Sequence, residues 1–151
     1  MTVEAFWAEF LRASGLPEDT WFESCFAFGM TGEAANELLR LVLEGKKRAT
    51  CSSRLGYEVD GEPLPTAGGY DIIIDGDGEP CCVIRTTAVR ELPFSEVTFD
   101  LCCREGEDDC LESWQENHRR FFRAEGKALG YTFTEDMPVI FEEFEVFWQK
   151  T

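Results

Sequence analysis

Histidine and basic residues are scarce in this sequence of 151 residues. His118 is the only histidine, and 14 Lys and Arg face 30 Asp and Glu, a formal net charge of -16 at pH 7. So acidic a chain repels phosphate backbones, which argues against general nucleic-acid binding unless its few basic side chains gather on one face. One histidine, together with cysteines that form no C-x-x-C pair, also argues against a zinc site. We therefore expect neither a metal ion nor another cofactor.

Long apolar segments are missing as well. No stretch of about 18 uncharged apolar residues is present. The first residues, "MTVEAFWAEF", place Glu4 and Glu9 where a signal peptide would have basic residues and then an apolar run. We expect a cytoplasmic protein that does not enter a membrane. Reduced thiols fit that compartment, and seven cysteines are present: Cys25, Cys51, Cys81, Cys82, Cys102, Cys103 and Cys110.

Apolar material for a core is plentiful, at 44% hydrophobic and 13% aromatic residues. This predicts a single domain over residues 1–151. Helical periodicity predicts a first helix capped by Thr2 and ended by "SGLPED", and a second capped by Thr31 and ended by Gly45. A third helix is expected from Asp109 to about Glu125.

Strand patterns follow the second helix. The segment "YDIIIDGDGEPCCVIRTTAV" predicts a hairpin, in which "DGDG" is a turn because its spacing does not suit an EF-hand calcium loop. The last segment, "MPVIFEEFEVFW", alternates and then slips phase, which predicts a β-bulge at Glu142 and Glu143. Short bulged strands with helices predict an α+β fold built on a small barrel.

The run "GKKRAT", residues 45–50, is the densest basic segment. It follows a helix C-terminus, whose partial negative charge by itself explains one basic residue there. A catalytic interpretation also fits, because Lys47 lies three residues before Thr50. A lysine can take a threonine proton when burial or neighbouring cations lower its pKa, and Lys46 and Arg48 are such neighbours.

A second group of polar residues is "REGEDD", before the third helix. Asp108 and Asp109, with Glu112, read as an ordinary acidic helix start. Glu105 and Glu107 precede the helix and are candidates for a general acid in a cleft.

The apolar face of the third helix contains Trp114 and His118. A lone histidine there is more often a core or rim residue than a catalyst. An aromatic side chain such as Trp114 belongs to the core by default, although at a barrel mouth it could stack on a base.

Taken in order, these motifs resemble the ASCH domain, in its branch of small bacterial single-domain proteins. The pattern G-x-K-x-x-T falls on Gly45, Lys47 and Thr50. The hairpin, "REGEDDCLESWQENH" and "DMPVIFEEFEVF" follow, and the likeness runs from Trp7 to Phe147. The resemblance implies a bulged β-barrel similar to the PUA domain, with flanking helices and a cleft lined by the basic loop.

The resemblance also implies two kinds of function. Some relatives are amidohydrolases of N-acylated cytidine that use a Lys, a Thr and a Glu, which places catalysis here on Lys47, Thr50 and either Glu107 or Glu105. The alternative is a non-catalytic module that binds RNA or a nucleotide through the same basic loop, or a ribonuclease. We expect a small nucleoside-like ligand rather than nucleic acid in general. Four further residues are then expected to bind the ligand: Lys46, Arg48, Trp114 and His118.

Overall fold

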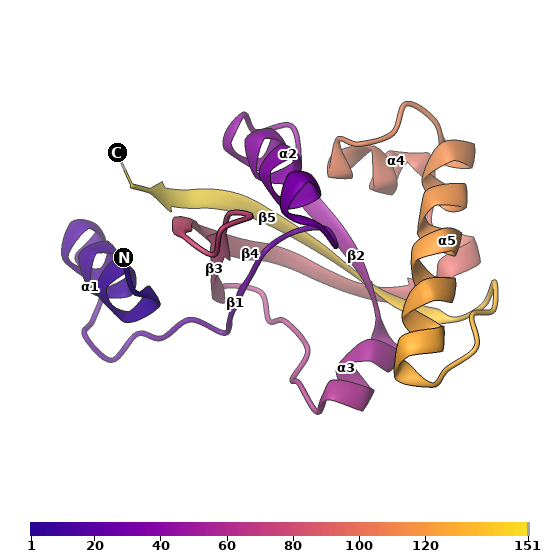
Figure 1. Cartoon of the computed structure of the whole chain (residues 1–151), viewed down its shortest axis with the longest axis horizontal. Coiled ribbons are helices and arrows are strands. Elements are labelled where there is room, and N and C mark those ends of the chain that lie inside the picture. Colours follow the sequence, from indigo (N-terminus) through magenta and orange to yellow (C-terminus); the bar gives the residue numbers. More distant parts are fainter. Residues whose placement is uncertain (151) are drawn as a thin grey trace.

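The computed structural model describes residues 1–150, which form one curled sheet covered by helices (Figure 1). The strand order is β1-β3-β4-β5-β2. β1 pairs with β3 in parallel and every other pair is antiparallel. Because β1 and β2 lie at opposite edges, the sheet is an open half-barrel. The strands are β1 (Ser24–Phe26), β2 (Ala49–Ser53), β3 (Tyr70–Ile74), β4 (Pro80–Pro93) and β5 (Pro138–Gln149).

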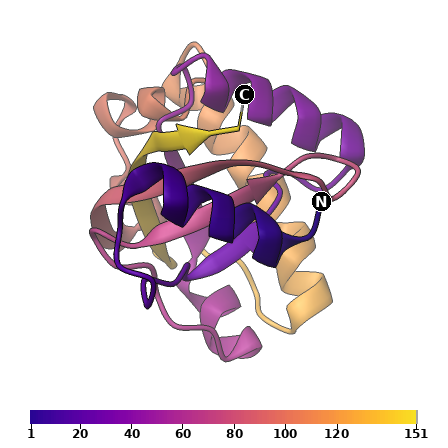
Figure 2. The same cartoon turned by 90° about the vertical axis from the view of Figure 1, so that its left-hand side faces the viewer.

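Helices cover the sheet at both ends. β4 and β5 run from α1 at one end of the molecule to α5 at the other (Figure 1), and Figure 2 shows α1 in front of the sheet with α5 behind it. The predicted α+β fold with a barrel-like sheet is thus confirmed in an open form. The helices are α1 (Val3–Ser14), α2 (Gly32–Leu43), α3 (Arg54–Asp60), α4 (Phe99–Cys102) and α5 (Leu111–Leu129), with 3-10 turns at Phe94–Glu96 and Cys103–Glu105.

Local capping signals set the helix ends. The Thr2 hydroxyl accepts a hydrogen bond from the Ala5 amide, and Thr31 does the same for Ala34, as the sequence predicts. Gly45 adopts φ +78 two residues after the end of α2. The third predicted helix, α5, extends one turn beyond the expected end, because the left-handed residue that stops it is Gly130.

The predicted hairpin is confirmed as β3 and β4, but the predicted bulge is wrong in detail. Glu142 and Glu143 pair without interruption with both β2 and β4. The residues skipped in the β4–β5 register are Thr87 of β4 and Phe147 of β5. Both faces of β5 are covered at its start, where Val139, Ile140 and Phe141 are all buried. The apolar residues at the start of β5 therefore do not alternate with polar ones, because both faces of the strand are buried there. The change of pattern along β5 does not mark the position of the register shift.

Each long helix packs on the sheet through its own apolar cluster. α1 contributes Phe6, Trp7 and Phe10 against Ile72 and Val83. Ile73, the next residue of β3, faces the opposite way, toward α2. α5 packs through Trp114 and Phe122 on Val139 and Phe141. This arrangement brings the loop that leaves α2 close to the loop that precedes α5, at the β2 edge.

Two properties bear on the class of protein. No helix within residues 1–150 is long and apolar enough to cross a membrane. Over the same span, no three His, Cys, Asp or Glu side chains gather as a metal site would require, and all seven cysteines are free thiols.

Candidate functional site

The basic run after α2 presents its three side chains in different directions. The backbone N–H groups of Lys46 and Lys47 both donate to the Leu41 carbonyl, which closes the end of α2. Lys47 then turns inward and is 2% exposed, whereas Lys46 and Arg48 are exposed. Only one of the three basic side chains is therefore part of an interior site.

Acceptors surround the buried Lys47 ammonium. Its Nζ lies 2.8 Å from Glu107 Oε2, 2.9 Å from the Ala49 carbonyl and 3.6 Å from Glu105 Oε1. It also lies 5.2 Å from the centre of the Phe28 ring. Two carboxylates thus compensate a cation that would otherwise be costly to bury. In this setting Nζ acts as a hydrogen-bond donor.

Gly106 explains how both glutamates of "EGE" reach the same lysine. It has φ +70, and a Cβ added to it would collide with the Lys46 carbonyl oxygen, so only glycine fits this close approach. The Arg48 amide donates to the Arg104 carbonyl at 2.8 Å and fixes the two loops together. Glu105 therefore enters the interior at 2% exposure, while Glu107 stays at the rim with 31% of its side chain exposed.

Glu105 is held by a network that reaches into α5. Trp114 Nε1 donates to Glu105 Oε2 at 2.6 Å, and His118 Nε2 lies 3.5 Å from Oε1. His118 Nδ1 is 2.9 Å from the Trp114 carbonyl, so this nitrogen is the one that donates to it. Trp114 and His118 lie one helical turn apart, but Glu105 lies in the loop before α5, so its place in this network depends on the loop conformation.

The charges in this network shift two pKa values in opposite directions. Burial alone would raise the pKa of Glu105, but the hydrogen bond with His118 and the charge of Lys47 outweigh it and lower that pKa. Burial would likewise lower the pKa of His118, but Glu105 outweighs it and raises that pKa. Both shifts favour an ion pair between the two side chains.

A cavity of about 210 Å³ brings the four predicted catalytic residues together. Lys47, Thr50, Glu105 and Glu107 line it, as does the predicted ligand-binding residue His118. Lys47 and Thr50 share no hydrogen bond in the described part of the chain. The other lining residues are Phe28, Gly29, Leu38, Cys51, Asn117 and Phe121.

The remaining predicted ligand-binding residues lie outside this cavity. Trp114 is fully buried and reaches the site through Glu105 and through His118, whose ring stacks on it. Lys46 is 3.3 Å from Glu44 on the surface. The exposed Arg48 joins the loop to β5 by backbone, because its carbonyl accepts from the Phe144 amide.

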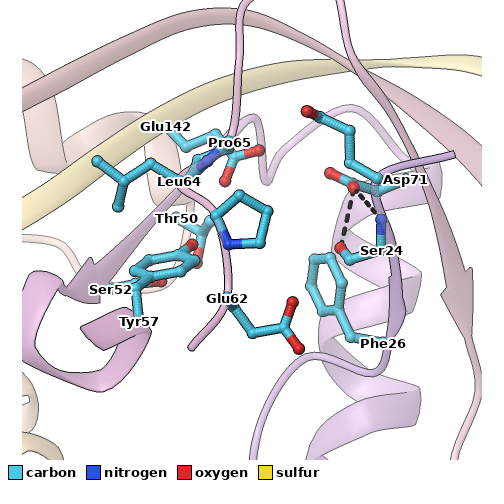
Figure 3. Close-up of a pocket in the computed structure, with 12 residues that line it drawn as sticks. Ser24, Phe26, Thr50, Ser52, Tyr57, Glu62, Leu64, Pro65, Asp71 and Glu142 are labelled. Carbon is cyan, nitrogen blue, oxygen red and sulfur yellow. Dashed lines mark hydrogen bonds between the residues drawn. The ribbon is translucent and has the colours of Figure 1, made fainter. Parts of the chain in front are cut away.

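Sequence reasoning missed a second cavity, of about 180 Å³, that Thr50 also lines (Figure 3). Carboxyl groups and hydroxyls dominate its wall. Asp71 Oδ1 accepts from both the amide and the hydroxyl of Ser24, and Glu142 Oε1 accepts from Thr86. Burial, with smaller effects from Asp71 and Glu23, raises the pKa of Glu142 to about 7. The sequence feature that could have indicated this cavity is Glu142, an acidic residue within the apolar segment "VIFEEF".

The fold is an open half-barrel, and a buried lysine, a threonine and an acidic loop lie at one of its edges. A comparison with protein families agrees with this arrangement. The profile of the ASCH domain matches residues 24–147, and the chain belongs to this family. A comparison with curated proteins finds no match.

Two crystal structures are similar to the chain over 95% of its length. One is a protein of Enterococcus faecalis V583 assigned to DUF984, with 40% identity, 86% of that chain covered and a TM-score of 0.88. The other is an ASCH domain from Lactobacillus crispatus JV V101, with 34% identity, 92% of that chain covered and a TM-score of 0.84.

Proposed function

We propose that this ASCH protein hydrolyses the amide of a small N-acylated nucleoside such as N-acetylcytidine, with Thr50 as the nucleophile. The observation that carries the proposal is the shared cavity of Lys47, Thr50, Glu105 and Glu107. A threonine hydroxyl needs a base to take its proton and a donor to stabilise the oxyanion that its attack creates. This cavity supplies both kinds of group.

Contacts divide the roles among the charged residues. Lys47 faces two carboxylates and a carbonyl, so it is the oxyanion donor rather than the base. Glu107, which is partly exposed at the rim, takes the Thr50 proton. Glu105 is tied to Trp114 and His118 and positions Lys47.

The wall and size of the cavity suit a small acyl group. Phe28, Leu38 and Phe121 provide apolar surface beside the polar residues. At about 210 Å³, the cavity is below the range of about 300–1,000 Å³ typical of drug-sized ligands, which favours a short acyl chain such as acetyl.

The alternative is a non-catalytic module for RNA or a nucleotide, or a ribonuclease. Its support is a basic stripe on α5, not the loop after α2, where Lys47 is compensated by carboxylates. The stripe places four of the 14 basic residues within positions 119–127: Arg119, Arg120, Arg123 and Lys127. Arg119 is itself paired with Glu135 at 2.7 Å, which weakens the stripe as a phosphate site.

Turnover of N-acetylcytidine by substituted proteins tests the proposal. Thr50→Ala and Lys47→Ala should each lower kcat/KM by about a hundredfold or more, and the double variant should be hardly worse than either, because the two residues act as a unit. Lys46→Ala is the matched control, since its exposed side chain lies outside the cavity. Circular dichroism melts of each variant check that it is folded.

Other results would reject the enzyme. The enzyme proposal fails if wild type turns over no acylated cytidine, or if Thr50→Ala, Lys47→Ala and Lys46→Ala all have equal turnover. The non-catalytic binding module is then the better explanation. In that case RNA binding should be lost when Arg120 and Arg123 are changed to Ala.

A further inference from the structure

Thr50 and Glu142 lie directly opposite each other in the β2–β5 ladder. Cross-strand partners on one face of an antiparallel pair have Cβ atoms about 4.5–5.5 Å apart. Both residues line the 180 Å³ cavity of Figure 3, and Thr50 lines the Lys47 cavity as well. The nucleophile of the proposed reaction therefore stands between two cavities, with Lys47 on one side and Glu142 on the other.

Glu142 offers a carboxyl oxygen to the cavity. The residue is 5% exposed, and its Oε1 accepts a hydrogen bond of 2.8 Å from Thr86 Oγ1. Within residues 1–150, Oε2 accepts none. Every fully buried side-chain oxygen or nitrogen in this part of the chain has a partner, so Oε2, which has none, is not fully buried, and Glu142 lines the cavity.

Four carboxyl side chains line this cavity beside hydroxyl and apolar residues: Glu23, Glu62, Asp71 and Glu142. Among the described residues, no Lys, Arg or His side chain lines this cavity, in contrast to the Lys47 cavity. A ligand group that donates N–H bonds fits such a wall, because carboxylates accept them. The titratable groups that face Glu142 from the surrounding elements are Glu23, Tyr57, Glu62 and Asp71.

We infer that the acidic cavity holds the amine side of the scissile amide, and that Glu142 is a further catalytic residue, which protonates the leaving nitrogen. This inference rests on the proposed function and extends it. It places the acyl group beside Lys47 and the nucleobase beside Tyr57 and Asp71, with the reacting carbon at Thr50. The preferred substrates are then amides whose amine carries further N–H donors, as aminopyrimidines do.

Atoms and protons balance over the two half-reactions. In acylation the Thr50 oxygen bonds to the carbonyl carbon, its proton passes to Glu107, the C–N bond breaks, and the Glu142 proton goes to nitrogen. In deacylation water attacks the acyl carbon and gives a proton to the Glu142 carboxylate. Thr50 then leaves and recovers its proton from Glu107. Both glutamates return to their starting forms.

The pKa of Glu142, raised to about 7 by burial, suits this exchange, because acid and base forms are then both populated near neutral pH. Tyr57, whose pKa burial raises to about 12, stays neutral over the same range.

Glu142→Gln should separate substrates by their leaving group. We expect it to lower kcat/KM for N-acetylcytidine about a hundredfold or more, yet to change kcat/KM for p-nitrophenyl acetate by less than about threefold, because p-nitrophenolate departs without a proton. The ester should also give a burst of nitrophenolate, since the variant lacks the base for deacylation. Glu145→Gln is the matched control, because Glu145 is an exposed acid of the same strand.

The outcomes are distinct. Equal losses on amide and ester, or no loss on either, overturn the role of Glu142 and leave the proposed function intact, provided that Thr50→Ala still abolishes both reactions. If Thr50→Ala retains both reactions, the proposed function and this inference fail together.

Thr86→Val provides a second test that does not depend on Glu142→Gln folding well. The Thr86 hydrogen bond lowers the pKa of Glu142, so its loss should move the fall of amide kcat/KM at alkaline pH to higher pH. The p-nitrophenyl acetate profile should not move. An amide profile that is unchanged by Thr86→Val, or one that shifts equally for the ester, contradicts the assignment.

Discussion

Lys47→Met removes one of the two cations that face Glu105, the other being His118, while it keeps most of the side-chain volume. Two charges 3.6 Å apart interact by about 5 kcal/mol at an effective dielectric constant of about 20. Breaking a buried pair by loss of one partner costs about 3–5 kcal/mol, because the other charge stays buried. The pair with Glu107 adds at most about 1 kcal/mol, since that side chain can turn to solvent. We therefore expect Lys47→Met to lower the free energy of unfolding by about 3–5 kcal/mol.

Urea unfolding followed by tryptophan fluorescence measures this loss. At about pH 8 the double variant Lys47→Met with Glu105→Gln should be more stable than Lys47→Met alone, because the buried Glu105 charge, which has lost its lysine partner, is gone. Below about pH 5 the deficit of Lys47→Met should shrink, since Glu105 can then bind a proton. Lys46→Met, on the exposed neighbour, should stay within about 0.5 kcal/mol of wild type. If the losses of unfolding free energy from Lys47→Met and Glu105→Gln simply add in the double variant, the interaction between Lys47 and Glu105 is refuted.

Three further predictions address the loop, the pH dependence and nucleic acid. Gly106→Ala should lower the free energy of unfolding by about 1–3 kcal/mol and reduce turnover. Gly61→Ala is the control and should cost less, because Gly61 has a similar φ with no atom near its Cβ position. Equal urea midpoints for the two variants would count against the close approach of Gly106 to the Lys46 carbonyl. His118 has a raised pKa, so its stabilisation is complete below about pH 6.5 and is lost as pH rises through the folded-state value. The difference in free energy of unfolding between wild type and His118→Gln should therefore become smaller as the pH rises. A difference that grows with pH would contradict a raised pKa of His118 in the folded state. Arbitrary RNA should give no gel shift at low micromolar protein and physiological salt, whereas a tight, steeply salt-dependent shift would contradict this.

Local signals predicted much of the helical structure and the hairpin. Thr2 and Thr31 cap as expected, because the interaction involves residues only three positions apart. β1 was not predicted, since three residues pair with β3 across 47 positions and carry no periodicity of their own. The end of α5 was placed too early because Gly126, inside the helix, packs against the Tyr131 backbone and does not terminate it.

The sequence indicated several residues that line the Lys47 cavity, but not how they are arranged. The spacing of Lys47 and Thr50 and the position of Glu105 and Glu107 before a helix made these residues candidates, and the family resemblance implied a cleft at the basic loop. Sequence alone left the roles of Glu105 and Glu107 open, because 60 positions separate Lys47 from Glu107 and only the fold shows which oxygen lies close. The sequence pattern predicts a bulge at Glu142, because a buried acidic residue and a β-bulge both interrupt the apolar alternation of a strand. The pattern alone does not distinguish the two.

An acyl-enzyme on Thr50 is the central claim, and mass spectrometry of protein quenched during turnover tests it most directly. Trypsin releases the segment "ATCSSR", residues 49–54, in which fragmentation distinguishes Thr50 from Cys51 and the two serines. With p-nitrophenyl acetate, Glu142→Gln should accumulate an acetyl group on Thr50, and the same protein with Thr50→Ala added should not. Turnover with acetyl found only on another residue, or full activity in Thr50→Ala, would contradict the account.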